Sequence, residues 1–329
     1  MNNKKKIIIG ILITAAAIVL IGIIGHLVYQ KNQKTMVTAS SDAQPESDEL
    51  DNSTVIYNGQ TYKLRRDIKT VLFMGVDKKN QEMLEERPVN GGQSDCMILL
   101  VMDTKNKTTK MIQISRETMV DISLYNEDGD FAGTQNAQIC LQYAYGDGKT
   151  RSCWLTKQVV SSLFYNIAIN NCIALNVEGL SVLTTAIGGV NIMIPQDYTV
   201  IDPSFTAGAQ LNLQGDQALK YVQYRDTSVS GSNNDRMERQ MQFLTALASQ
   251  MKEKAGDNNW YTNMMDIANP YMVTDADAET IQQLSSYSLE TEILKVPGES
   301  VAGAEHDEYH VDVDGLYQMV LDVFYEVKE

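Results

Sequence analysis

The pattern of hydrophobic and polar residues separates an apolar N-terminal segment from the rest of the chain. Residues 7–29 are apolar apart from Thr14 and His26, and such a run can cross the roughly 30 Å hydrocarbon core as one helix. Three Lys at positions 4–6 precede it, which places the N-terminus in the cytoplasm. A cleaved signal peptide is the alternative, but its apolar region spans only about 7 to 15 residues. We therefore predict that residues 1–29 comprise a cytoplasmic Lys cluster and a single transmembrane anchor in the cell membrane.

The next residues predict a stalk and a small ribbon outside the membrane. Residues 30–54 are polar and lack periodicity, which is typical of a flexible extracellular stalk. Residues 55–69 open with alternating side chains around Asn58-Gly59, a type I′ hairpin signal. We expect a short β-ribbon there, followed by one main domain over residues 70–329.

The main domain shows apolar runs that alternate with helical periodicity, and this predicts an α/β fold. The runs are apolar on both faces, so we expect a central sheet that is covered by helices on both faces. A four-residue polar turn at 104–107 joins two of the strands as an antiparallel hairpin, so the sheet should be mixed. Residues 121–151 are predicted to form a long, partly irregular crossing, and residues 196–214 a loop. Strands are expected at 71–77, 96–103, 109–115, 172–177, 190–195 and 291–296, and helices at 152–165, 178–189, 216–225, 235–254, 260–269, 276–288 and 314–326.

Composition and charge narrow the class of function. The chain carries 27 Lys and Arg against 42 Asp and Glu, a net charge of −15. Setting aside the three Lys before the apolar segment leaves 24 basic and 42 acidic residues, a net −18 outside the membrane. This charge argues against nucleic-acid binding. Only three His are present, which disfavours a His-based metal site or a Ser-His-Asp triad.

Strand ends bring a first group of charged residues together. In an antiparallel hairpin with its turn near residues 105–106, paired residue numbers add up to about 211. Asp95 should therefore lie opposite Arg116, and Asp77 ends another apolar strand. Two carboxylates and a guanidinium at one sheet edge could hold Mg²⁺ (or Mn²⁺) and a phosphate. A structural salt bridge that closes the strand ends explains the same residues equally well.

A second group follows the predicted helix at 216–225. Gln223 and Arg225 end this helix, whereas Arg236, Arg239 and Gln240 lie near the start of the next one. Arg residues in a first helical turn oppose the helix dipole unless an anion binds there, although an exposed face with ordinary charge pairs is the alternative. Together the two groups predict phosphoryl-type chemistry, in which a metal and arginines stabilise negative charge and a carboxylate assists an attacking hydroxyl.

Several co-linear strings resemble the LytR-CpsA-Psr (LCP) family of Gram-positive cell envelopes. They are VLFMGVD (71–77) and the stretches 93–120, 177–194, 211–225 and 234–247. The resemblance implies transfer of a glycopolymer, such as teichoic acid or capsule, from a polyprenyl pyrophosphate carrier to peptidoglycan, with Mg²⁺ on the pyrophosphate. A sugar hydroxyl of the murein would displace the lipid pyrophosphate.

Matching the family's motifs residue by residue gives the expected site. The metal-associated carboxylates would be Asp77 and Asp95, and with Arg116 and Arg225 they form the expected catalytic set. The expected pyrophosphate-binding residues are Arg116, Arg225, Arg236, Arg239, Gln240, Gln93 and Gln223.

Two of these positions depart from the family's pattern. Gln93 and Gln223 stand where the family usually has Arg, and Glu117 stands where Asp is common. Each Arg-to-Gln change removes a charge-assisted hydrogen bond worth roughly 1.5–3 kcal/mol when buried. A non-catalytic module that binds lipid-linked glycan or cell-wall material is therefore the main alternative to a transferase, and a polyprenyl pyrophosphatase is a third.

The four Cys residues raise the question of whether the domain outside the membrane contains disulfides. An even number of Cys outside the membrane is compatible with disulfides. Cys140 and Cys153 form the most plausible pair, whereas Cys96 and Cys172 lie in apolar strands and are expected to be buried thiols.

Overall fold

The computed structural model describes residues 54–78, 89, 91–226, 228–229, 231–254 and 267–328. The predicted transmembrane segment at 7–29, the stalk up to residue 53 and most of the helix expected at 260–269 lie outside these residues. Within the described ranges, no helix is both long and apolar enough to span a bilayer.

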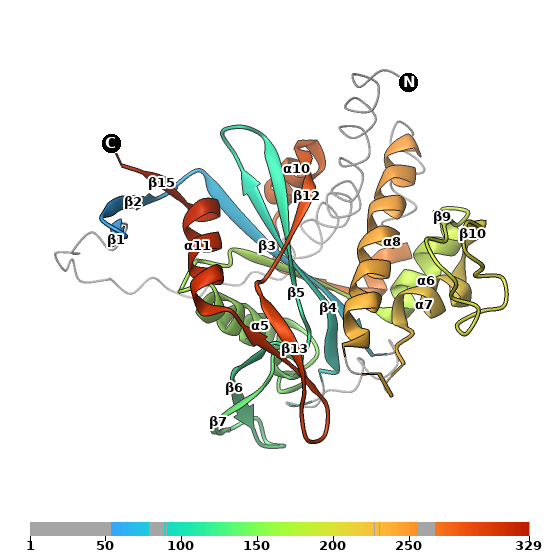
Figure 1. Ribbon diagram of the computed structural model, residues 1–329, viewed down its shortest axis with the longest axis horizontal. Coiled ribbons are helices and arrows are strands. Elements are labelled where there is room, and N and C mark those ends of the chain that lie inside the picture. The colour runs from blue at the N-terminus through green and yellow to red at the C-terminus, as the bar shows by residue number, and fades with distance from the viewer. Residues whose placement is uncertain are drawn as a thin grey trace, which may run out of the picture.

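A six-stranded mixed sheet forms the centre of the domain, as predicted (Figure 1). β3 (Ile68–Asp77) pairs antiparallel with β4 (Gln93–Asp103) and parallel with β8 (Asn171–Asn176). β5 (Thr108–Ile114) pairs antiparallel with β4 and parallel with β12 (Ser288–Lys295). Met97 lies opposite Ile114 and Asp103 opposite Thr108, which is the hairpin register predicted from the turn. In sheet order the strands are β11 (Met272–Thr274), β8, β3, β4, β5 and β12.

Helices cover both faces of this sheet. On one face α5 (Thr150–Leu163) and α11 (Val313–Phe324) bury their apolar side chains against Leu72 and Leu99. On the other face α8 (Ser232–Lys254) and α10 (Ala278–Ser286) pack on Val71, Ile98 and Leu100. Alternate residues of β3 and β4 therefore pack into the apolar cores on opposite faces of the sheet, which explains why both strands are continuously apolar in sequence.

A separate apolar cluster forms a lobe beside the sheet (Figure 1). It is built by α6 (Val177–Ala186), α7 (Gly215–Gln223), β9 (Val190–Met193) and β10 (Gln210–Leu213) around Phe205, Tyr221 and Phe243. α6 follows β8 directly because the Asn176 side chain accepts a hydrogen bond of 2.8 Å from the Gly179 amide and caps the helix. This abrupt strand-to-helix change brings α6 and α7 to the ends of β3 and β8.

Four small sheets complete the described part of the fold. One is the β9–β10 pair of the lobe, in which β9 lies in the strand expected at 190–195 and β10 in the expected loop. Two of the other three were not predicted. The ribbon at 55–69 is confirmed as β1 (Thr54–Tyr57) and β2 (Gln60–Leu64), extended by β15 (Tyr325–Val327). The partly irregular crossing predicted at 121–151 instead contains β6 (Met119–Tyr125), β7 (Phe131–Gln138) and the short helix α4 (Leu141–Ala144). The second unpredicted hairpin is formed by β13 (Gly298–Ala302) and β14 (Asp307–Val311). One strand of each hairpin, β7 or β13, is largely exposed, so neither hairpin shows the apolar alternation that predicts a strand.

Candidate functional site

An irregularity in the β3–β4 pairing places Asp95 at the centre of the site. Gly75 pairs with Cys96 and Val76 pairs with Ser94, so Asp95 is the extra residue of a β-bulge. A bulge turns a side chain out of the regular alternation of a strand. Asp95 is thereby directed toward the end of the sheet where α8 begins.

Asp95 pairs with two arginines from different elements. Its Oδ1 lies 3.0 Å from Nε of Arg116, and its Oδ2 lies 3.7 Å from Nη1 of Arg236. The predicted approach of Asp95 and Arg116 is therefore confirmed, and Arg236 joins them from α8. Arg116 also donates to Gln93 Oε1 and, at 3.2 Å, to Cys140 Sγ. Gln93 thus accepts a hydrogen bond from Arg116 at the position where the family usually carries a second positive charge.

A chain of hydrogen bonds connects Arg236 with the segment after β5. Arg236 Nη2 donates to Asn233 Oδ1 at 2.6 Å, and Asn233 Nδ2 donates to Ser115 Oγ at 3.1 Å. The Ser115 hydroxyl accepts in turn from the Glu117 amide at 3.2 Å. These bonds fix the start of α8 relative to the two residues that flank Arg116.

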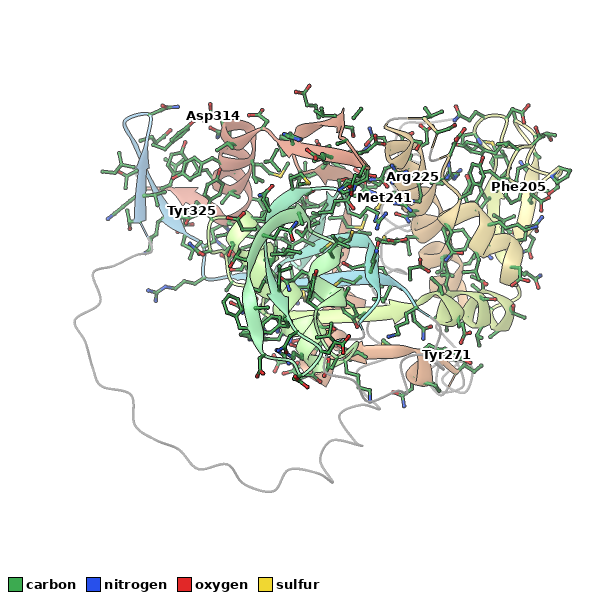
Figure 2. All side chains as sticks on the ribbon, turned by 90° about the horizontal axis from the view of Figure 1, so that it is seen from below. Phe205, Arg225, Met241, Tyr271, Asp314 and Tyr325 are labelled. Atoms are coloured by element: carbon green, nitrogen blue, oxygen red, sulfur yellow. The ribbon has the colours of Figure 1, made fainter. Side chains whose placement is uncertain are left out.

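Arg225 lies at the junction of the sheet and the α7–α8 lobe (Figure 2) and is held by two carboxylates. Its Nη1 pairs with Glu117, its Nη2 lies 2.9 Å from Asp307 Oδ2, and its Nε donates to Ser232 Oγ at 3.2 Å. Neither carboxylate was predicted as a site residue. Glu117 was visible beside Arg116 in the family motif, whereas Asp307 lies 82 positions from Arg225 in an exposed hairpin and gives no local signal.

These contacts change the electrostatic description of the site. Three arginines, Arg116, Arg225 and Arg236, are matched by three carboxylates, Asp95, Glu117 and Asp307. The sequence predicted a local excess of positive charge for an anion. The structure instead shows a cluster that is balanced in formal charge, so an anionic ligand must bring a cation or displace a carboxylate.

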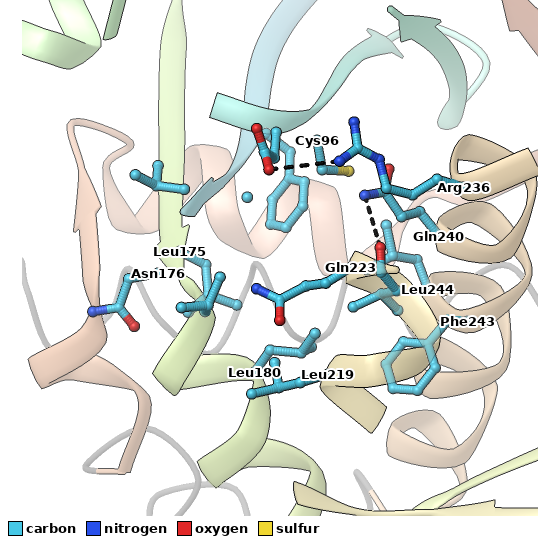
Figure 3. A pocket seen from close by; sticks show the side chains of 16 residues that line it. Cys96, Leu175, Asn176, Leu180, Leu219, Gln223, Arg236, Gln240, Phe243 and Leu244 are labelled. Carbon is cyan, nitrogen blue, oxygen red and sulfur yellow. Dashed lines mark hydrogen bonds and ion pairs between the residues drawn. The ribbon is translucent and has the colours of Figure 1, made fainter. Parts of the chain in front are cut away.

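An apolar pocket with a cavity volume of about 70 Å³ opens beside this cluster (Figure 3). Its polar lining consists mainly of Asp95, Arg236, Gln240 and Gln223, and Figure 3 shows the Gln223 side chain reaching into the space. Within the described part of the chain, Arg236 Nε and Gln240 Oε1 are buried without hydrogen-bond partners, which costs free energy unless a ligand or water satisfies them. The apolar lining is formed by Phe73, Val76, Leu175, Val177, Leu180, Leu219, Val222, Phe243 and Leu244.

A second, more polar pocket of about 620 Å³ shares Val177, Leu219 and Gln223 with the first. Asp77 lines this second pocket and not the first, together with Glu178 and Asp216. The two predicted metal carboxylates, Asp77 and Asp95, therefore face neighbouring pockets. Among the described residues, no group of three or more His, Cys, Asp and Glu is arranged to hold a metal ion by itself.

Arg239 is not brought to the cluster. Its Nε donates to the Tyr221 carbonyl at 2.8 Å, another of its nitrogens donates to the Tyr224 carbonyl, and its guanidinium lies 5.0 Å from the centre of the Tyr198 ring. It therefore joins α8 to the end of α7. The argument from the helix dipole also needs correction, because α8 begins at Ser232 and neither Arg236 nor Arg239 belongs to its first turn.

All four cysteines are free thiols, including the pair Cys140 and Cys153. Cys140 lies against Arg116, and burial raises the pKa of its thiol to about 11 despite that positive charge. Cys96 lines the apolar pocket, and burial raises its pKa to about 12. Both thiols are therefore neutral at physiological pH and are poor nucleophiles.

Burial also shifts two charged groups of the cluster. It raises the pKa of the Glu117 carboxyl, against the lowering effect of Arg225 and with a further increase from Asp307. It lowers the pKa of Arg236, which Asp95 partly restores and Arg116 and Arg225 lower further. Arg225 and Glu117 thus act electrostatically on Arg236, so the two ion-pair groups form one coupled site.

The raised pKa of Glu117 predicts a pH dependence of stability. A carboxyl with a raised pKa binds its proton more tightly in the folded state than in the unfolded state. Its contribution to the free energy of unfolding therefore falls as the pH rises above 4.5, the ordinary pKa of a Glu carboxyl. Glu117→Gln removes this titration. As the pH rises from about 4.5 to the raised pKa, we expect the thermal unfolding midpoint of wild type to decrease relative to that of Glu117→Gln. Thermal unfolding of both proteins across this range checks it, and parallel pH profiles would contradict it.

Comparisons with known proteins identify the family of the chain. Residues 25–323 match the sequence model of the LytR_cpsA_psr family. The chain is 26% identical over 216 residues to "Polyisoprenyl-teichoic acid--peptidoglycan teichoic acid transferase TagU" of Enterococcus faecalis, covering 66% of this chain and 64% of that protein. It is 26% identical over 252 residues to the teichoic acid transferase TagV of Bacillus subtilis, covering 74% of this chain and 57% of TagV. The matched region thus spans less than two thirds of each relative.

Solved structures share the fold at low sequence identity. Protein gbs0355 from Streptococcus agalactiae superposes with a TM-score of 0.60 at 20% identity, covering 79% of this chain and 90% of that one. B. subtilis TagV superposes with a TM-score of 0.57 at 23% identity, covering 79% and 96%. TagT bound to LI-WTA gives a TM-score of 0.56 at 20% identity, covering 78% and 90%. The chain therefore belongs to the LytR_cpsA_psr family, as its motifs predict.

Proposed function

We propose that this protein transfers a glycopolymer from a polyprenyl pyrophosphate carrier to peptidoglycan on the outer side of the cell membrane, anchored there by residues 7–29 with its N-terminus in the cytoplasm. The observation that carries the proposal is the apolar pocket that ends at Asp95, Arg236 and Gln240. An apolar space joined to buried guanidinium and amide groups matches the two chemical halves of a polyprenyl diphosphate. The names of the TagU and TagV relatives support the same substrate class.

Different parts of the pocket would bind the two halves of the substrate. The apolar side chains of β3, α6, α7 and α8 would hold the isoprenoid, and Arg236 and Gln240 would bind the diphosphate at the mouth of the pocket. Asp95 keeps the Arg116 and Arg236 guanidiniums on opposite sides of one carboxylate, so their donors are oriented before the substrate binds. Such preorganised donors stabilise the charge that develops on the departing lipid phosphate, when the acceptor hydroxyl attacks the glycan-bearing phosphorus and the bond between the two phosphates breaks. The more polar neighbouring pocket is open to an acceptor hydroxyl.

The proposal includes Mg²⁺ (or Mn²⁺), and the described residues fit it in part. Mg²⁺ is commonly held by one or two carboxylates together with substrate phosphates, so the lack of a larger acidic group does not conflict with it. Asp77 and Asp95 would be the protein ligands. Asp77 lines the more polar pocket together with Glu178 and Asp216, and Asp95 lines the apolar one. When bound, the cation would neutralise negative charge on the diphosphate.

A non-catalytic binding module is the second candidate, and the balanced charges favour it. Gln93 and Gln223 supply no positive charge, and the three arginines of the cluster each face a carboxylate. Such a site could hold a lipid-linked glycan without stabilising a transition state. The pocket would serve both functions, so turnover must separate them.

A pocket substitution tests the proposed function. Leu180→Asp places a carboxylate in the apolar pocket, and we expect it to weaken binding of farnesyl diphosphate by about tenfold or more while inorganic pyrophosphate binding changes little. Val200→Asp is the matched control, because Val200 is 73% exposed. Equal affinities for farnesyl diphosphate in Leu180→Asp and Val200→Asp would show that this pocket does not hold the lipid.

A transfer assay on the whole chain then separates the candidates. Lipid-linked glycopolymer, peptidoglycan and Mg²⁺ are incubated with the protein in detergent. Covalent attachment to peptidoglycan supports the transferase, and binding without turnover supports the module. Release of lipid phosphate without an acceptor would identify a pyrophosphatase.

A further inference from the structure

Every nitrogen of the Arg225 guanidinium already has a partner within the protein. Nη1 pairs with Glu117, Nη2 with Asp307 and Nε with Ser232. The side chain is only 14% exposed and lines neither pocket. These contacts use three of its five N–H groups, so Glu117 and Asp307 compete with a phosphate for the charge of this guanidinium.

The two carboxylates differ in how firmly they are built into the fold. Glu117 has no exposed side-chain surface, and its backbone is fixed on both sides, because its amide donates to Ser115 Oγ and its carbonyl accepts from the Tyr309 amide at 2.9 Å. Asp307 stands at the first position of β14, its side chain is 11% exposed and its partner strand β13 is mostly exposed, although its own backbone carbonyl accepts from Gln138 Nε2 at 2.7 Å. Of the two carboxylates, Asp307 is the one that can move without disturbing the central sheet.

One oxygen of Asp307 also holds the backbone that leads into α8. Asp307 Oδ2 accepts from Arg225 at 2.9 Å and from the Gly231 amide at 3.1 Å. Gly231 has a φ of +76° and directly precedes Ser232, the first residue of α8. Departure of this carboxylate would free a guanidinium group and a backbone N–H together, and both are donors suited to a phosphate.

Resting on the proposed function, we propose that Asp307 is a positioning residue that holds Arg225 in place of the diphosphate, and that an anionic ligand binds in full only by displacing it. The exchange replaces one anion by another at the same donors, so the buried guanidinium is paired in both states. It also gives the charge-balanced cluster the net positive charge that a diphosphate requires. The β13–β14 hairpin thereby controls the affinity of the site.

Removing the Asp307 charge tests this exchange, because the exchange and a purely structural role predict opposite changes in diphosphate affinity. Asp307→Asn keeps the side-chain shape but lowers the competition for Arg225. We expect the whole chain in detergent to bind farnesyl diphosphate and Mg²⁺ about three- to tenfold more tightly than wild type. A role limited to holding the fold together predicts weaker binding. Glu308→Gln is the matched control, because it removes the same charge from the next residue of β14, whose side chain pairs with His310.

Two further measurements make the result decisive. In the double variant Asp307→Asn with Arg225→Gln the gain should disappear, since the freed guanidinium is absent. The amide resonance of Gly231 in wild type should shift when the diphosphate binds, because its acceptor changes from the Asp307 carboxylate to a phosphate oxygen.

Each outcome either supports or overturns the exchange. Binding by wild type with no gain in Asp307→Asn over Glu308→Gln would overturn the exchange and leave the proposed function intact. Failure of wild type and of all variants to bind farnesyl diphosphate would overturn the proposed function and the exchange with it.

Discussion

Replacing Arg236 by Ala is expected to lower kcat/KM for glycopolymer transfer by about 100-fold or more. This is the loss typical when one preorganised donor to a developing negative charge is removed. Arg236 is 4% exposed, lines the apolar pocket and pairs with Asp95, and its Nε has no partner within the described residues. The substitution also leaves Asp95 with one arginine in place of two. Transfer kinetics of the purified chain, measured beside its thermal unfolding midpoint, provide the test.

Two other residues of α8 serve as controls for Arg236→Ala. Glu238→Ala alters an exposed residue of the same helix, whose side chain is 66% exposed. Arg239→Lys alters a guanidinium that binds carbonyl groups of α7. We expect Glu238→Ala to keep wild-type kinetics and Arg239→Lys to lose stability with little change in kcat/KM of the folded protein. If Arg239→Lys lowers kcat/KM as strongly as Arg236→Ala while remaining folded, the assignment of these two arginines is wrong.

Local sequence patterns were sufficient to predict the sheet and the Asp95–Arg116 pair. The hairpin register follows from the position of one turn, and extrapolating it by two residues places Asp95 opposite Arg116, whose side chains lie 3.0 Å apart. The continuous apolar runs of β3 and β4 correctly indicated helices on both faces. Both predictions depend on contacts close in sequence or on burial, which leave a direct periodic signal.

The partners of Arg225 could not be predicted in the same way. Asp307 approaches from an exposed hairpin that follows the last strand of the sheet, and its contact with Arg225 depends on how β14 lies beside residues 117–118. Hydrophobic periodicity is silent about such contacts, because the hairpin buries little apolar surface. The bulge at Asp95 was missed for a similar reason, since the pattern of apolar residues continues through it. The sequence therefore indicated the arginines and Asp95, but not the two carboxylates that hold Arg225.

Gln93 and Gln223, the two departures from the family pattern, are not equivalent in the structure. Gln93 accepts a hydrogen bond from Arg116, so an Arg at position 93 would lose this bond and repel the neighbouring guanidinium. Gln223 ends α7, is exposed and lines both pockets. A positive charge at that helix end is favourable, and the side chain already reaches into the space where a diphosphate would bind.

Gln223→Arg is therefore expected to strengthen farnesyl diphosphate binding by about tenfold or more, since a charge-assisted hydrogen bond is worth roughly 1.5–3 kcal/mol. If the wild-type chain binds without turnover, this variant should also gain transfer activity. Gln93→Arg should show no gain, and Gln217→Arg controls for added charge on α7, because Gln217 is hydrogen-bonded to Ser204 in the lobe. Titration calorimetry and the transfer assay on all three variants measure these effects. An equal gain in Gln217→Arg would mean that net charge alone, and not the position of Gln223 between the pockets, governs diphosphate affinity.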